Sequence, residues 1–515
     1  MTAITMVSDL ALDPRTGEVV AAMPVSTPQH LAETVAAAVL ATTAVGSVSP
    51  AARAGWLEGL ANAVAGAVDT LVPTADRETG LGTARLTAEV ARCANQLRFY
   101  AAVCREGSWL GATIDHATSD TPDLRRVAVP LGPVAVFGAS NFPFGFGTLG
   151  NDTGSALAAG CPVIVKGHPA HPLTHAALAD LAASTLAELG APAGTFGAVT
   201  GLDNGRALVL DDAISAVAFT GSQAAGLSLW SLAQSRPRVI PVFAEMGTVN
   251  PVVVTPAAVA QPDALATLAK GSVQSFTLGM GQFCTKPGLL LVPAGAGVAP
   301  AVAAELEAAS PRGPLLTAGM ARSYAEGVRT LQLSGATLVG AVAEPGAGWG
   351  VCATVLTAPA ARLVPGSPLL AECFGPAILV VEYADDAELT AILDRLQGAL
   401  VGCVMTAGAD DPDAPAVVTS LARFVGRVAV DAWPTGVATT WAQQHGGPWP
   451  STTVPAATSV GAAALARFTR PVAFQNTPPT ALPPALADAN PWRLPRRVDG
   501  RFVPVPGRPG KKRAP

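Results

Sequence analysis

The sequence predicts an α/β protein built on parallel sheets, and its composition and the order of its apolar segments both support this. Half of the 515 residues are apolar but only 5% are aromatic, so the core must consist mainly of Ala, Val and Leu. From about residue 127, short apolar runs end in Gly or Pro and are followed by Ala-rich segments. Strands that alternate with helices need crossover connections, which produce a parallel sheet covered by helices.

The elements are expected in a definite order along the chain. Residues 50–103 carry Ala, Leu and Arg at helical spacing, which predicts amphipathic helices. Strands are expected at VAVFGAS (134–140), VIVK (163–166), TFGAVTG (195–201), AISAVAFTGS (213–222), RVIPVFAEM (238–246), PVVVT (251–255) and GLLLVP (288–293). A chain of this length is expected to form two or three substructures.

No membrane-spanning helix is expected, although half of the chain is apolar. The two long uncharged stretches, 127–151 and 287–304, are interrupted by Gly and Pro. The first residues lack a basic leader ahead of an apolar run, which favours a cytoplasmic protein. The seven cysteines are an odd number without a CxxC pair, so reduced thiols are expected.

The C-terminal segment 493–515 differs from the rest in its charge. It carries eight Lys or Arg residues and one acidic residue. We expect a solvated, disordered tail here. Nucleic-acid binding is not expected, because the segment lacks interleaved aromatic side chains.

Cys284 is the candidate nucleophile among the cysteines. It lies in GMGQFCT (279–285), where paired glycines allow a turn that presents the thiol instead of burying it. A thiolate adds to an aldehyde carbonyl and leaves a hemithioacetal that can expel hydride. A single cysteine in an apolar chain is more often an inert core residue, so this motif alone leaves both interpretations open.

Glu245 and Asn141 are candidates for the remaining chemistry. Glu245 closes an apolar strand just before a Gly turn, so it is either half of a structural ion pair or a base in a cleft. Asn141, in FGASNFPF (137–144), is either a turn or helix cap or a side chain that donates to an oxyanion.

Candidates for cofactor binding follow two of the expected strands. TGSQAAG (220–226) opens a helix directly after a strand, so backbone N–H groups and the helix dipole point at an anion. It is not the usual GxGxxG dinucleotide fingerprint. Lys166 ends VIVK, where its ammonium either reaches a ribose or phosphate or is simply solvated.

Together and in this order, these segments resemble the aldehyde dehydrogenase superfamily from about Asp13 to Asp499. The resemblance implies that Cys284 is the nucleophile, Asn141 the oxyanion donor and Glu245 the general base. ECFGP (372–376) is similar to the EXFGP element, whose glutamate holds the nicotinamide ribose. The cofactor residues that follow from the resemblance are Lys166, His168, Gly221, Ser222, Glu372 and Phe374. No metal site is expected.

Finer motifs resemble the 2,5-dioxovalerate (α-ketoglutarate semialdehyde) dehydrogenase branch, which is close to bacterial NADP-dependent fatty aldehyde dehydrogenases. These motifs are KGHPAHP (166–172), GMGQFC (279–284), PTGV (434–437), HGGP (445–448) and RPVAFQN (470–476). Met246, Val249 and Asp431 depart from the residues that are usual in the family at these positions.

The resemblance also implies a domain organisation. A Rossmann-type cofactor domain is expected over 1–246, with 432–469 returning to it, and an α/β catalytic domain over 247–431. Residues near 115–130 and 470–492 are expected to form a small β arm for oligomerisation, which implies a homodimer or homotetramer. The tail of 493–515 would follow the arm.

The expected function is NAD(P)-dependent oxidation of a small aldehyde, 2,5-dioxovalerate before others, to a carboxylic acid through a thioester on Cys284. The alternatives are a medium- or long-chain fatty aldehyde dehydrogenase and a non-catalytic relative that acts as a binding protein. Glu245 argues against acyl transfer to coenzyme A. NADP is expected to be preferred over NAD. Pro169 stands where NAD-preferring members carry a glutamate, and that carboxylate would repel a 2′-phosphate.

Overall fold

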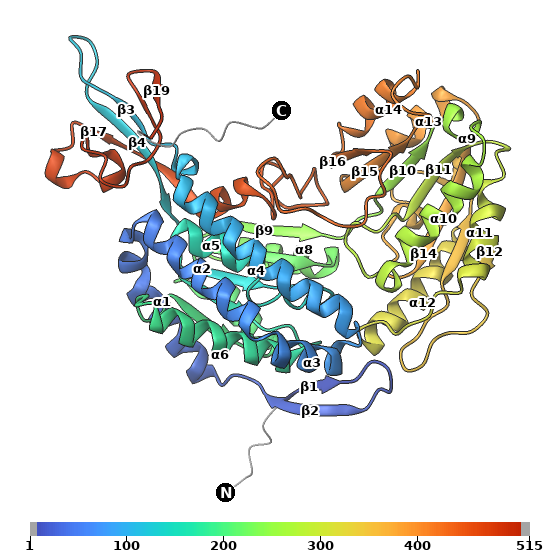
Figure 1. The fold of residues 1–515 in the computed structure, drawn as a ribbon, viewed down its shortest axis with the longest axis horizontal. Coiled ribbons are helices and arrows are strands. Elements are labelled where there is room, and N and C mark those ends of the chain that lie inside the picture. The colour runs from blue at the N-terminus through green and yellow to red at the C-terminus, as the bar shows by residue number, and fades with distance from the viewer. Residues whose placement is uncertain (1–7, 506–515) are drawn as a thin grey trace, which may run out of the picture.

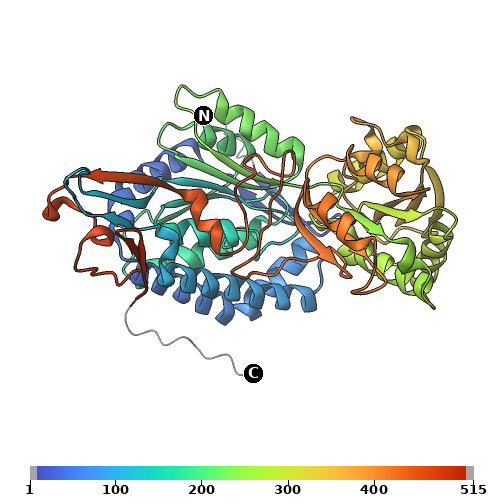
Figure 2. The same cartoon turned by 90° about the horizontal axis from the view of Figure 1, so that it is seen from above.

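The structure, a computed structural model, describes residues 8–505, and three β-sheets organise them (Figure 1). Two of the sheets are covered by helices and lie at the two sides of the molecule, while the third projects beyond the first (Figures 1 and 2). A separate hairpin joins β1 (Ser8–Leu12) and β2 (Val19–Pro24). The predicted α/β class with parallel sheets is confirmed.

The first sheet is entirely parallel, with its strands in the order β7-β6-β5-β8-β9. They are β5 (Val134–Phe137), β6 (Val163–Lys166), β7 (Phe196–Val199), β8 (Ala216–Gly221) and β9 (Val242–Met246). Every residue of β5 and β6 is buried, as expected for strands covered on both faces. The strand order reverses between β5 and β8. Such a reversal leaves a crevice at the carboxyl ends of the strands, where ligands bind.

Helices cover both faces of the first sheet. On one face, the core is formed with α2 (Pro50–Gly66), α3 (Val68–Thr79), α4 (Thr83–Glu106), α5 (Asn151–Ala159) and α6 (Pro172–Glu188). On the other face, it is formed with α1 (Pro28–Ser47), α7 (Leu202–Leu210) and α8 (Gln223–Gln234). The helices predicted over 50–103 are therefore present, as α2, α3 and α4.

The second sheet has seven strands in the order β12-β13-β14-β11-β10-β15-β16, and only the edge strand β12 is antiparallel to its neighbour. The strands are β10 (Pro251–Val254), β11 (Leu289–Pro293), β12 (Thr337–Ala341), β13 (Thr354–Thr357), β14 (Ala377–Tyr383), β15 (Ala399–Met405) and β16 (Val425–Val430). One face packs on α10 (Ala264–Thr277) and α11 (Val298–Ala309). The other packs on α12 (Ala318–Leu333), α13 (Asp386–Leu393) and α14 (Ala414–Leu421).

The third sheet, called the arm sheet below, has the order β17-β4-β3-β18-β19. It consists of β3 (Thr113–Asp115), β4 (Leu124–Pro130), β17 (Thr469–Gln475), β18 (Arg496–Val498) and β19 (Arg501–Val503). Two of its five strands lie beyond residue 492, where the predicted arm ends.

The prediction of a disordered tail is wrong for residues 493–505. β18 pairs with β3, aligning Arg497 with Thr113, and continues as a hairpin into β19. The guanidinium of Arg496 donates to the carbonyls of Ala487 and Asp488, so this basic residue stabilises a chain turn instead of facing water. Residues 506–515 of the predicted tail lie outside the described part of the chain.

Within residues 8–505, no helix combines the length and the apolar character that crossing a bilayer requires.

Candidate active site

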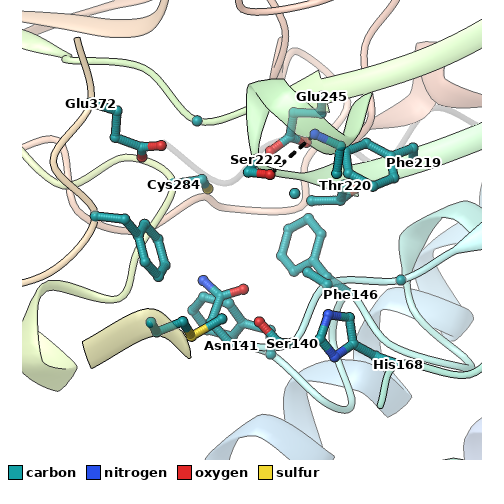
Figure 3. A pocket seen from close by; sticks show the side chains of 18 of the residues that line it. Ser140, Asn141, Phe146, His168, Phe219, Thr220, Ser222, Glu245, Cys284 and Glu372 are labelled. Carbon is teal, nitrogen blue, oxygen red and sulfur yellow. Dashed lines mark hydrogen bonds between the residues drawn. The ribbon is translucent and has the colours of Figure 1, made fainter. Parts of the chain in front are cut away.

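A cavity of about 560 Å³ lies between the first and second sheets (Figure 3). Loops after β5, β6, β8 and β9 form one wall, and loops of the second sheet's body form the other. Of the nine predicted site residues, the structure brings eight to this cavity: Asn141, His168, Gly221, Ser222, Glu245, Cys284, Glu372 and Phe374. Lys166 is the predicted residue that does not line it.

Cys284 follows a tight turn of unusual backbone conformation. Gly279, Met280 and Gly281 have φ values of 55°, 56° and 68°, all in the left-handed region. A Cβ on Gly281 would lie 2.3 Å from the carbonyl oxygen of Gly375, so this position requires glycine. The turn brings the nucleophile loop against the loop that carries Glu372, and it leaves Cys284 partly exposed to the cavity.

Glu245 is the second-to-last residue of β9, and its side chain is only 3% exposed. The hydroxyl of Ser459 donates to Oε2, and Nε2 of His445 lies 2.9 Å from Oε1. Burial by itself raises the pKa of Glu245, but attraction to His445 and the contact with Ser459 outweigh it and hold the pKa below its ordinary value. The side chain is therefore a carboxylate at neutral pH.

His445 links this carboxylate to the nucleophile. Its Nε2 atom lies 3.7 Å from Sγ of Cys284, and the ligand atoms of Glu245, Cys284 and His445 all lie within 4.8 Å of one another. Burial, with the negative charges of Glu245 and Glu372, raises the pKa of the Cys284 thiol well above its usual value. A thiol in this setting needs a nearby proton acceptor before it can react.

The chain reaches this arrangement because segment 445–460 runs beside β9. The N–H of Met246 donates to the carbonyl of Ser451, and the N–H of Ala244 donates to the hydroxyl of Thr453, both at 2.9 Å. The sequence analysis used HGGP only as a branch motif and assigned His445 and Ser459 no role. A histidine in a Gly-rich loop was the signal that could have identified His445.

Asn141 lies in the loop after β5, and its side chain is held against the nucleophile loop. Nδ2 donates to the carbonyl of Gln282 at 2.8 Å, which uses one of the two amide hydrogens. Arg85 donates to the carbonyl of Asn141 at 2.7 Å and fixes the loop from the other side. The second amide hydrogen is left for an oxyanion at the reacting carbon.

The cofactor candidates occupy the opposite part of the cavity wall from the nucleophile loop (Figure 3). Gly221 ends β8, and Ser222 caps α8 by accepting the N–H of Ala225 at 3.3 Å, so the amino end of α8 faces the cavity. Nδ1 of His168 accepts the N–H of Ala170 at 3.1 Å. Burial and the charges of His171 and Lys166 lower the pKa of His168 well below its usual value, so its ring is neutral with the proton on Nε2.

Glu372 is held by a buried lysine. Burial raises the pKa of Glu372 to about 7, and the charge of Lys286 opposes that rise. The Lys286 ammonium donates to the carbonyls of Cys373 and Ala377 at 3.0 and 2.9 Å, which fixes the loop around Glu372. A Cβ on Gly247 would lie 2.2 Å from a carboxylate oxygen of Glu372, so glycine is needed for this approach.

The profile described as "Aldehyde dehydrogenase family" matches residues 10–470. The chain belongs to this family. This aldehyde dehydrogenase is 44% identical over 467 residues to α-ketoglutaric semialdehyde dehydrogenase 2 of Azospirillum brasilense, covering 88% of this chain and 87% of the relative. It is 38% identical over 457 residues to α-ketoglutaric semialdehyde dehydrogenase of Acinetobacter baylyi, covering 87% and 86%. The predicted family and branch resemblance is thus confirmed.

Solved structures agree with this aldehyde dehydrogenase in fold. A mutant of aldehyde dehydrogenase C from Pseudomonas syringae, in complex with NAD+ and octanal, matches with a TM-score of 0.79 at 21% identity, covering 93% of this chain and 95% of that one. 1-Pyrroline-5-carboxylate dehydrogenase from Thermus, with bound NAD, matches with a TM-score of 0.77, also at 21% identity, covering 92% and 90%.

The close approach of Gly281 to Gly375 leads to a stability prediction. Gly281→Ala should destabilise the enzyme by more than the roughly 1–2 kcal/mol that a left-handed alanine costs, because its Cβ also meets a backbone carbonyl. Gly295→Ala is the matched control, since Gly295 has a φ of 75° with nothing within 4 Å of its Cβ position. Urea unfolding of both variants measures the difference, and equal losses would contradict the packing argument.

Proposed function

We propose that this enzyme oxidises the aldehyde group of 2,5-dioxovalerate (α-ketoglutarate semialdehyde) and releases 2-oxoglutarate. The observation that carries the chemistry is the buried contact of Cys284 with His445 and Glu245 at one end of the cavity. The two semialdehyde dehydrogenases, at 44% and 38% identity over most of the chain, support the choice of substrate.

The first step is addition of the Cys284 thiol to the aldehyde carbon. Its proton passes to Nε2 of His445, 3.7 Å away, and the imidazolium that forms is stabilised by the Glu245 carboxylate. The free amide hydrogen of Asn141 and the backbone N–H of Cys284 hold the oxyanion of the hemithioacetal.

The second half of the reaction releases the acid. A bound nicotinamide cofactor supplies the acceptor for the hydride that leaves the hemithioacetal. Glu245 then takes a proton from a water molecule, whose oxygen attacks the thioester carbon and displaces Cys284. A lowered pKa keeps Glu245 in the charged form that this role needs.

The residues present fit a nicotinamide dinucleotide. The capped amino end of α8 at Gly221 and Ser222 suits a pyrophosphate, and Glu372, for which Gly247 leaves room, suits a ribose diol. Nε2–H of His168 and the Lys166 ammonium would reach the adenosine end. Phe374 would pack against the nicotinamide end. Residues 1–246 with 432–469 would form the cofactor domain and 247–431 the catalytic domain.

We also propose that NADP is preferred over NAD. Pro169 is exposed and brings no carboxylate to the loop after β6, so a 2′-phosphate meets no repulsion there. Lys166, whose pKa burial lowers and Asp9 raises, supplies a positive charge at the end of the same strand.

The arm sheet is the proposed oligomerisation element of a homodimer or homotetramer. Its edge strand β19 exposes Phe502 and Val503, at 63% and 41%, and an exposed apolar edge strand favours pairing with another chain. A cytoplasmic location stays a prediction from the sequence.

The proposed function predicts a substrate preference. kcat/KM with NADP should be at least tenfold higher for 2,5-dioxovalerate than for octanal, measured by the absorbance of the reduced cofactor. Cys284→Ala should abolish turnover but still bind cofactor, because the thiol forms the covalent bond and does not hold the nucleotide. A preference for octanal would support the fatty-aldehyde alternative, and no turnover of any aldehyde would support a binding protein.

The acid and base roles predict opposite effects for two variants. Glu245→Gln should slow thioester hydrolysis more than its formation, so a pre-steady-state burst of reduced cofactor should appear or grow. His445→Gln should slow the burst phase itself, because the thiol loses its proton acceptor. Stopped-flow absorbance measures both. If the burst vanishes in Glu245→Gln as well, Glu245 acts mainly on the thiol.

The loop after β6 predicts the cofactor preference. Pro169→Glu should lower kcat/KM for NADP about fivefold or more relative to NAD, because its carboxylate would repel the 2′-phosphate. Pro169→Gln, which adds a side chain of the same size without charge, should change the ratio much less. A wild type that prefers NAD tenfold, or equal effects of the two variants, would place discrimination elsewhere.

A further inference from the structure

Helix α4 holds the oxyanion loop through one of its faces. Arg85, Glu89 and Arg92 recur at spacings of four and three residues, so they share that face. Oε1 of Glu89 accepts the N–H groups of Phe144 and Gly145 at 2.9 and 3.0 Å. Together with the bond from Arg85 to the carbonyl of Asn141, these contacts fix the loop beside the nucleophile.

This face carries more positive than negative charge. Within residues 8–505, Glu89 is the only carboxylate whose charge acts on Arg85 or Arg92. Burial raises the pKa of Glu89, so the carboxyl contributes at most one negative charge against two guanidinium groups. Nη1 of Arg85 is buried and has no hydrogen-bond partner among the described residues. A partly buried, unbalanced cation is unfavourable until an anion joins it.

Aromatic rings hold both guanidinium groups at the edge of the cavity. Cζ of Arg92 lies 5.5 Å from the ring centres of both Phe142 and Phe146, and these two phenylalanines line the cavity. Cζ of Arg85 lies 5.0 Å from Phe142 and 5.2 Å from Phe283, the residue before Cys284. The rings keep water from the cations, which strengthens their attraction for an anion.

Arg92 also acts on the reacting sulfur. Its positive charge opposes the rise in the pKa of the Cys284 thiol, so the two groups lie within electrostatic range. Nη2 of Arg92 donates to the carbonyl of Val437 at 3.0 Å, and its other donors make no hydrogen bond within the described chain. No Lys or Arg is found among the described residues that line the cavity itself.

We propose that Arg92, assisted by Arg85, binds the distal carboxylate of the substrate and thereby selects short ω-oxo acids over neutral aldehydes. The inference rests on the proposed function, from which it takes the anionic substrate. A five-carbon oxo acid is short, so its carboxylate must find a cation close to the carbon held by Cys284. Charged hydrogen bonds from a guanidinium to a carboxylate provide both affinity and orientation.

The test compares two aldehydes that differ in the carboxylate alone, 5-oxopentanoate and pentanal. Arg92→Gln should lower kcat/KM for 5-oxopentanoate about 30- to 100-fold, mainly through KM, and change that for pentanal less than threefold. Arg92→Lys should recover part of the loss because it restores the charge. Arg85→Gln should give a smaller loss with the same selectivity, and it serves if Arg92→Gln does not fold.

Two arginines provide controls. Arg98→Gln lies on the same helix, where Arg98 donates to Asn95 and Asn62, and it should leave both aldehydes unchanged. Arg427 also acts on the Cys284 charge, but its Nη2 donates to the carbonyls of Pro434 and Gly436. A selective loss in Arg427→Gln instead of Arg92→Gln would overturn the assignment.

The remaining outcomes separate the two proposals. Equal losses for both aldehydes in Arg92→Gln would mean that Arg92 only supports the loop, and would overturn the carboxylate site. A wild type that favours 5-oxopentanoate together with an Arg92→Gln variant that keeps this preference would do the same, while leaving the proposed function intact. A wild type that favours pentanal would contradict the proposed function itself.

Discussion

A buried carboxylate is the constraint on which the rest of the site depends. Glu245 is almost completely removed from water at the carboxyl end of β9, and an unpaired charge there would be strongly unfavourable. Ser459 and His445 satisfy it, and both come from segment 445–460, which pairs with the backbone of β9. The same contacts that stabilise the carboxylate bring an imidazole to the thiol of Cys284. Stability and chemistry therefore depend on one set of contacts.

The junction between the two large sheets positions the other half of the site. The left-handed turn at Gly279, Met280 and Gly281 is unfavourable for an isolated chain, and it persists because Gly281 packs against the carbonyl of Gly375. Lys286 joins the same loop through two carbonyls. Nucleophile and cofactor residues from distant parts of the chain thus share one rigid support, which suits a reaction that needs both within contact distance.

Helix α4 connects the fold to the choice of substrate. Glu89 and Arg85 hold the loop of Asn141, so removing either would disturb the oxyanion donor as well as the local charge. Two cations with a single carboxylate exceed what holding a loop requires. The surplus charge beside an aromatic wall distinguishes this site from one lined by apolar groups alone, which would suit a neutral aldehyde equally well.

The sequence by itself determined the α/β class, the first sheet's strands and the candidate roles of Cys284, Glu245 and Asn141. Each of these lies in a local strand-and-turn pattern, whose spacing is readable without knowledge of distant contacts. The hairpin of β18 and β19 was missed, because composition describes a basic segment as solvated when its arginines can also bond to carbonyls such as that of Ala487.

Only the tertiary structure decided which groups meet at the nucleophile. Ser459 lies 214 residues from Glu245 and His445 lies 161 residues from Cys284, and contacts over such separations leave no periodic trace in the sequence. Arg92 likewise reads as one more basic residue on an amphipathic helix. Its surplus charge can be recognised only after folding, since it depends on which acidic groups come within reach and which do not.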